Sequence, residues 1–226
     1  MGSTKPECAK CAIKNKICRS PEGRGPAFCP TLNRKKIVEK AQEEYARPEI
    51  MEFARQASIQ EAQCYANRGV KPYILHPTKP RVEEICEFAQ KMGYKKLGTA
   101  FCGGLHSEAL SFTRILEAQG FEVVSVVCMV GRTPKEDIGV KDEEKVHIGE
   151  FESMCSPIAQ AMILNEEKTD FNVLVGLCVG HDSLFLKYSR AYCTVLVAKD
   201  RVLGHNPCAA LYTTGCYYAR MLRKGF

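Results

Sequence analysis

Three apolar stretches of this chain each end in a cysteine that a glycine follows within three positions. They read LGTAFCGG at 97–104, VVSVVCMVG at 123–131 and VLVGLCVG at 173–180. Short apolar runs with glycine at their ends predict buried strands. Because the carboxyl ends of parallel strands line one edge of an open sheet, we expect Cys102, Cys128 and Cys178 to meet in the crevice there.

A fourth cysteine, Cys155, stands before the helix start signal Ser156-Pro157 and can face the same crevice. Helix amino termini carry partial positive charge, which favours the thiolate form needed for metal binding or nucleophilic attack. Cysteine is also a small hydrophobe that is common in cores. We expect this packing role for the cysteines at positions 64, 86, 193 and 216, and a shared metal or cluster site for the four crevice cysteines.

Strand and helix patterns alternate along most of the chain. The expected strands are 96–101, 121–127, 172–177 and 194–198, and the expected helices are 80–92, 105–119, 157–165, 181–188 and 206–222. This order predicts an α/β fold with a doubly wound, mostly parallel sheet of the Rossmann or flavodoxin-like type. We expect it to occupy residues 80–226, after a cysteine-rich module at 1–33 and a helical segment with a linker at 34–79, broken near Pro48.

The N-terminal module carries the pattern Cys8-x₂-Cys11-x₆-Cys18-x₁₀-Cys29. A C-x₂-C pair places two sulfurs of one tight turn on one metal, and two further cysteines complete a tetrahedral set. Zinc and iron–sulfur clusters both accept four thiolates. Residues 1–33 hold few large apolar side chains, so we expect them to fold only with metal.

The chain has a formal net charge of +6, which residues 1–47 supply with 11 Lys and Arg against 5 acidic residues. Few aromatic side chains lie among these charges to stack on bases, which disfavours nucleic acid as a partner. The charge is better matched to thiolate sites, since four thiolates on a divalent metal or a [4Fe–4S]²⁺ core leave about −2.

The sequence also bears on the compartment. Residues 1–30 are charged and lack the apolar core of a secretory leader, and the apolar run at 171–180 is far short of the ~20 residues of a membrane span. We therefore expect a cytoplasmic protein with reduced thiols and no membrane partner.

Several polar residues follow the strands at the same sheet edge. His181 and Asp182 come after Cys178, Lys199 follows the fourth strand, and His205 precedes the last helix. They are candidate catalytic residues, as general acids or bases or as an anion cradle. The alternative for each is a helix cap or a surface charge, and Asp182 in particular suits a cap.

The N-terminal cysteine set and the motifs AFCGGL, VVCMVG, EFESMCSPIAQA, GLCVGHDSLF and KDRVLGHNP together resemble an uncharacterised family of metal-binding proteins defined only as a domain of unknown function. The resemblance covers nearly the whole chain. It implies that one ligand set is formed by Cys8, Cys11, Cys18 and Cys29 and a second by Cys102, Cys128, Cys155 and Cys178. It implies no particular reaction.

Three classes of function follow, of which the third is a nucleic-acid binder that uses the basic N-terminal module. The first is an iron–sulfur protein with a [4Fe–4S] cluster in the crevice and a second centre in the N-terminal module. It would suit electron transfer with a donor or acceptor protein, or oxidoreductase or sulfur chemistry on a small-molecule substrate. The second is a zinc protein whose Cys₄ site is a structural module for binding protein or nucleic acid.

Overall fold

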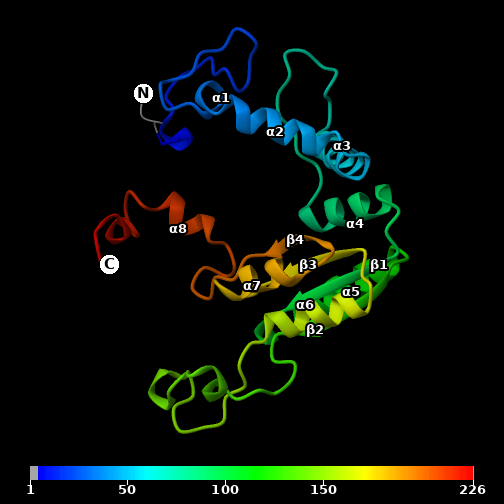
Figure 1. The fold of residues 1–226 in the computed structure, drawn as a ribbon, viewed down its shortest axis with the longest axis vertical. Coiled ribbons are helices and arrows are strands. Elements are labelled where there is room, and N and C mark those ends of the chain that lie inside the picture. The colour runs from blue at the N-terminus through cyan, green and yellow to red at the C-terminus, as the bar shows by residue number, and fades with distance from the viewer. Residues whose placement is uncertain (1–4, 226) are drawn as a thin grey trace. The chain divides into compact units, whose positions relative to one another are not determined.

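The computed structural model describes residues 5–225 of the chain, which divides into two compact units, Met1–Gln63 and Cys64–Phe226. The first unit contains a 3₁₀ turn at Cys8–Lys10 and the helices α1 (Pro30–Asn33), α2 (Lys35–Tyr45) and α3 (Pro48–Gln63), drawn in blue and cyan in Figure 1. The predicted break near Pro48 is confirmed, since α2 ends at Tyr45 and α3 begins at Pro48. Proline suits this first helical position because the N–H that it lacks would have no hydrogen-bond partner within the helix.

The first unit has almost no core. Among its described residues only Gln60 is buried, and α2 buries no side chain at all. Hydrogen-bonded turns and an isolated bridge between Lys16 and Arg24 order the cysteine-rich segment ahead of α1. The backbone of this segment is therefore organised without apolar burial.

The second unit is built on four parallel strands: β1 (Lys96–Phe101), β2 (Glu122–Val127), β3 (Phe171–Val175) and β4 (Tyr192–Val197). They pair in the order β2-β1-β3-β4. Its helices are α4 (Arg81–Lys91), α5 (His106–Ala118), α6 (Pro157–Glu166), α7 (His181–Tyr188) and α8 (Cys208–Tyr212). The predicted α/β fold with a doubly wound parallel sheet is confirmed.

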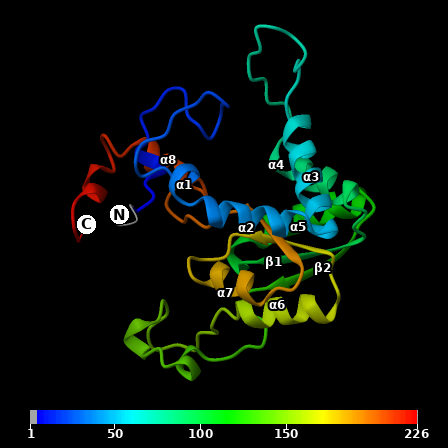
Figure 2. The ribbon, with the colours of Figure 1, turned by 45° about the horizontal axis from the view of Figure 1, so that its top comes forward.

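The direction of the crossovers sets the layers. The connection through α5 moves from β1 to one edge, and the connection through α6 moves from that edge past β1 to β3. Right-handed crossovers in opposite directions put α5 and α6 on opposite faces, with α7 packed beside α6 (Figure 2). The strand order thus reverses between β1 and β3, where such folds open their crevice.

Two buried contacts hold the carboxyl edge of the sheet. Gln160 of α6 donates from Nε2 to the carbonyls of Phe101, at 3.2 Å, and Val126, at 2.7 Å. Gly176, with φ +68°, lies so close to Leu105 that a Cβ would stand 2.7 Å from its Cδ2. The first contact joins α6 to the ends of β1 and β2. The second packs the residue before α5 against the residue after β3.

A 26-residue excursion, 129–154, connects β2 to α6 and leaves the sheet edge as the green loop of Figure 1. Its two limbs are joined at the base, where Lys135 N donates to Glu152 O at 3.1 Å and Met154 N donates to Thr133 O at 2.8 Å. The Lys145 ammonium, nearly buried, bonds Glu136 at 2.9 Å. Ion pairs and hydrogen bonds therefore order this segment.

Two predictions about the C-terminal region are wrong. Residues 206–222 form the five-residue helix α8 and a 3₁₀ turn at Ala219–Leu222, in place of one long helix. The Thr213 hydroxyl donates to the Ala209 carbonyl at 2.7 Å and Gly215 follows, so side-chain competition and glycine end the helix. Cys216 is exposed there, which also contradicts its predicted packing role.

None of the helices described is long and apolar enough to cross a membrane.

Candidate functional site: a thiol cluster at the sheet edge

The register of the sheet places the first two crevice cysteines side by side. Phe101 of β1 pairs with both Val127 and Val175, so the three strands end level. Cys102 follows β1 directly and donates from its N–H to the Val175 carbonyl at 3.1 Å. Cys128 follows β2 directly and donates to the Phe101 carbonyl at 2.8 Å.

Cys178 and Cys155 reach the edge from loops. Strand β3 ends two residues earlier than predicted, and the left-handed turn at Gly176 carries the chain to Cys178, whose carbonyl accepts from the N–H of His181 at 3.0 Å. Cys155 precedes α6, and the N–H of the next residue, Ser156, donates to the Cys128 carbonyl at 2.6 Å.

The four thiols are neighbours. The Cys128 thiol hydrogen-bonds with the thiols of Cys155 and Cys102, and Cys155 also lies within electrostatic reach of Cys178. Cys128 is buried and the other three are half-buried. Within residues 5–225, however, no three His, Cys, Asp or Glu side chains form a ready-made set of metal ligands. The thiols thus lie together without a preformed coordination geometry.

Hydrogen-bond donors surround the sulfurs. Lys199 Nζ lies 3.4 Å from Cys102 Sγ, and an Arg201 guanidinium nitrogen lies 3.0 Å from Cys178 Sγ. The N–H of Gly103 donates to Cys128 Sγ at 3.4 Å. Donors and cations beside sulfur stabilise the thiolate form.

The Cys128–Cys155 pair shares a proton unequally. The hydrogen bond from Cys155 lowers the pKa of the Cys128 thiol, against the opposing effect of burial, and the Gly103 N–H adds to the lowering. The same bond, together with burial, raises the pKa of the Cys155 thiol. Cys128 is therefore the thiolate of the pair and Cys155 the thiol that donates to it.

The four predicted catalytic residues have different environments. Lys199 touches the cluster, and His181 favours the Cys128 thiolate while its buried Nδ1 has no hydrogen-bond partner in the described chain. Asp182 accepts from the N–H groups of Gly180, at 3.0 Å, and Ser183, at 2.7 Å, within the first turn of α7, whose N-cap is Gly180.

His205 shapes its own loop. Its Nδ1 accepts from the N–H of Asp200 at 3.1 Å, and the Asp200 carboxylate in turn accepts from the N–H groups of Val202 and Leu203. Arg201, which the sequence places after the fourth strand with Lys199 as a possible donor at this edge, is presented by this same turn.

The four N-terminal cysteines lie in three separate backbone segments. Cys11 N donates to the Cys8 carbonyl at 3.1 Å, so the C-x₂-C pair forms one tight turn. Cys18 lies in the turn that follows Lys16, and Cys29 heads α1. Cys8 and Cys18 are exposed, so at least two of these sulfurs face solvent.

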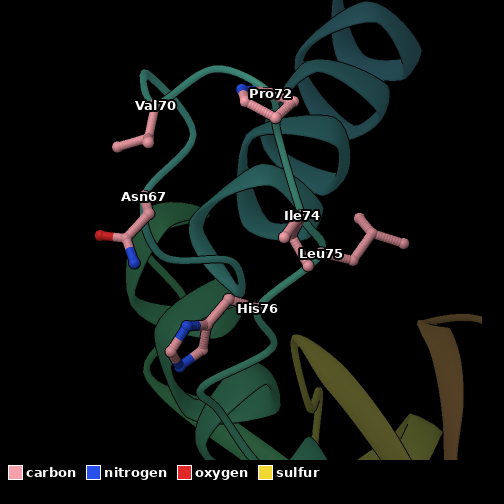
Figure 3. A pocket seen from close by; sticks show the side chains of 6 residues that line it. All are labelled: Asn67, Val70, Pro72, Ile74, Leu75 and His76. Atoms are coloured by element: carbon pink, nitrogen blue, oxygen red, sulfur yellow. The ribbon is translucent and has the colours of Figure 1, made fainter.

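A separate cavity of about 330 Å³ lies in the arm, the segment 64–80 that links α3 to α4 in the sequence. It is lined by Asn67, Val70, Pro72, Ile74, Leu75 and His76 (Figure 3). The arm closes through main-chain bonds from Ala66 N to His76 O, at 2.9 Å, and from Thr78 N to Cys64 O, at 2.9 Å. Its lining is mostly aliphatic and contains none of the predicted site residues, so it offers little chemistry.

Comparison with known proteins places the chain in context. Residues 29–196 match the model of a family described as "Protein of unknown function (DUF1847)". The chain is also similar to the uncharacterized protein MJ0455 of Methanocaldococcus jannaschii. The two sequences are 45% identical over an alignment of 192 residues, which covers 85% of this chain and 91% of that protein. The family match contains all four crevice cysteines and begins at Cys29, after Cys8, Cys11 and Cys18.

Proposed function

Since the chain belongs to the DUF1847 family of proteins of unknown function, which supplies no reaction, we propose a function from the thiol cluster itself. We propose that the protein binds metal and holds a [4Fe–4S] cluster with Cys102, Cys128, Cys155 and Cys178. The observation that carries the proposal is the meeting of these four thiols, from two strand ends, a loop and a helix start, at the switch point of the sheet.

The surroundings of the thiols fit such a group. Soft thiolates select iron–sulfur clusters, zinc and copper(I) over hard cations. A cluster with four thiolates carries about −2 in its oxidised state, and Lys199 and Arg201 already contact two of the sulfurs. The Gly103 N–H and the unpartnered His181 Nδ1 supply further polar groups next to Cys128. Hydrogen bonds of this kind tune a bound cluster.

We also propose a second metal centre in the N-terminal module, with Cys8, Cys11, Cys18 and Cys29 as its ligands. The tight turn of the C-x₂-C pair and the near absence of buried side chains among the described residues of that unit support it. Two such centres suit electron exchange with a partner protein, or redox or sulfur chemistry on a small molecule, in the reducing cytoplasm.

Zinc is the alternative, and one observation favours it. The Cys128 thiol contacts those of both Cys155 and Cys102. A single zinc ion bound at ~2.3 Å by each sulfur keeps its ligands in mutual contact, whereas a cubane binds each sulfur through a different iron. A Cys₄ zinc site would be structural or would support an interaction module.

Anaerobic purification followed by metal and acid-labile sulfide analysis tests the proposal. We expect a brown protein with about four iron and four sulfide per crevice site. A colourless protein with stoichiometric zinc and no sulfide would support the zinc alternative. A protein that binds neither metal under anaerobic reconstitution would overturn both.

A further inference from the structure

Cys128 and Cys155 are paired through both backbone and side chain. The Ser156 N–H donates to the Cys128 carbonyl at 2.6 Å, and the two thiols hydrogen-bond to each other. This main-chain bond sets the peptide that follows Cys155 directly against that of Cys128. Disulfides join residues whose Cα atoms lie about 4.4–6.8 Å apart, a separation that residues on hydrogen-bonded main chains can adopt.

We infer that Cys128 and Cys155 form a dithiol site that low-molecular-weight disulfides oxidise to an intramolecular disulfide. This is a covalent activity of the chain's own sulfurs and is distinct from metal binding. It is an activity of the crevice without metal, whichever metal the four thiols bind.

The surroundings select this pair among the four thiols. Cys102 is in contact with the Lys199 ammonium and Cys178 with the Arg201 guanidinium, each drawn toward the loop that follows β4. Cys128 has the thiols of both Cys155 and Cys102 as neighbours. Of these two, Cys102 is the one that lies against a cation within the described residues, which leaves Cys155 as the partner of Cys128.

The excursion 129–154 keeps the pair together. Its limbs are joined close to both cysteines by the bond from Met154 N to Thr133 O and by the bridge between Pro134 and Ser153. The two limbs of the excursion are therefore fixed to each other next to the two cysteines. A disulfide here would close a loop whose base is already closed by hydrogen bonds.

The reaction is a two-step thiol–disulfide exchange. One sulfur of the pair, as its thiolate, attacks one sulfur of the small disulfide, whose S–S bond breaks and releases one thiolate. The other sulfur of the pair then attacks the protein sulfur of this mixed disulfide, forming the Cys128–Cys155 disulfide and releasing the second thiolate. The two thiol protons end on the released thiolates, and two electrons pass to the small disulfide, which becomes two thiols.

One consequence rests on the proposed function. The disulfide uses two of the four proposed crevice ligands, so a metal bound there and the Cys128–Cys155 disulfide exclude each other. Oxidation would then release crevice metal, and bound metal would protect the pair from oxidation.

Trypsin gives a direct test, because it places each crevice cysteine in its own peptide: Cys102 in 97–114, Cys128 in 115–132, Cys155 in 146–168 and Cys178 in 169–187. The full-length reduced protein is treated with chelator, desalted without oxygen and exposed to 2-hydroxyethyl disulfide. Mass spectrometry of the unreduced digest should show 115–132 joined to 146–168 as the main crosslink, and dithiothreitol should separate them.

A Cys155→Ser variant should lose this crosslink, and Cys86→Ser, which alters a buried cysteine of α4, should keep it. The inference is wrong if the chelator-treated wild-type protein leaves both thiols free, or joins Cys128 mainly to Cys102 or Cys178. This wild-type result decides the question even if the Cys155→Ser variant does not fold.

Added zinc or reconstituted iron should lower the crosslink yield at least tenfold. A crosslink that forms equally well with and without metal would contradict metal binding at the crevice while leaving the dithiol site intact. The two proposals therefore fail separately.

Discussion

Lys199 and Cys102 are 97 residues apart in the sequence, yet Lys199 Nζ lies 3.4 Å from Cys102 Sγ. Lys199 follows β4 and Cys102 follows β1, with β3 between those strands in the sheet. The loop after β4 therefore crosses the end of β3 to bring its cations to the thiol cluster. This crossing connects charge to sulfur at the proposed metal site.

Replacing Lys199 or Arg201 with Met should weaken metal retention at the crevice. Hydrogen bonds to charged groups contribute about 1.5–3 kcal/mol, so each loss should speed metal transfer to a chelator roughly tenfold or more. Transfer rates measured with a chromogenic chelator test this. Lys187→Met changes an exposed lysine of α7 and should behave as wild type. Unchanged rates in both cluster variants would contradict a neutralising role.

Cys178→Ala should remove or destabilise the crevice chromophore of anaerobically prepared protein, because it deletes one of four proposed ligands. Absorbance and iron content per chain report the loss. Cys86→Ala is the matched control, since Cys86 is buried in α4 and belongs to no proposed ligand set. Equal iron contents in the two variants would exclude Cys178 as a ligand.

Gly176→Ala should destabilise the second unit. Its φ of +68° disfavours any side chain, and the new Cβ would stand 2.7 Å from Leu105, whose side chain is fully buried. Backbone strain and overpacking each cost about 1–3 kcal/mol. Urea unfolding should show a larger loss than for Gly120→Ala, where φ is +87° but nothing lies within 4 Å. Equal losses in the free energy of unfolding would show that the Leu105 side chain moves away from the new Cβ at little cost.

Low pH should weaken the hydrogen bonds that hold the excursion 129–154 in its folded form. The Lys135 ammonium, with the N–H groups of His147 and Val146, lowers the pKa of Glu152 to about 2. A lowered pKa stabilises the folded form above the ordinary value of 4.5, and this contribution is lost as the pH falls from there toward 2. Hydrogen exchange at the amides of residues 146 and 147 should therefore show less protection near pH 3 than at pH 6, after correction for intrinsic rates.

Glu152→Gln should abolish most of that pH dependence, because the amide does not titrate. Glu143→Gln, also on the excursion, should retain it. A wild-type protein with the same corrected protection at both pH values would contradict the role assigned to Glu152.

Residues 1–33 should lose their structure when metal is removed. Their unit buries little, so binding free energy must supply folding free energy. After chelation, trypsin should cleave rapidly at the Arg24–Gly25 bond while the sheet of the second unit stays intact. Continued resistance of that bond in metal-stripped protein would show that the module folds by itself.

The regular elements follow closely from the sequence. The bounds of β1 and α7 agree with the expectation to the residue, since an alternation of buried runs and helix signals is a local property. The C-terminal helix fails because Thr213 and Gly215 end α8 after a single turn or so, and competition between side-chain and main-chain bonds outweighs the apolar pattern there.

The sequence by itself determined that thiols gather at one edge of a parallel sheet, because every parallel strand ends on the same side. Only the tertiary structure decided that Cys128 faces Cys155, that the Cys178 loop turns at Gly176, and that Arg201 reaches a sulfur. Those contacts join segments that are distant in the chain. They depend on the strand order and on how far each loop folds back across the edge, neither of which leaves a local signal in the residues concerned.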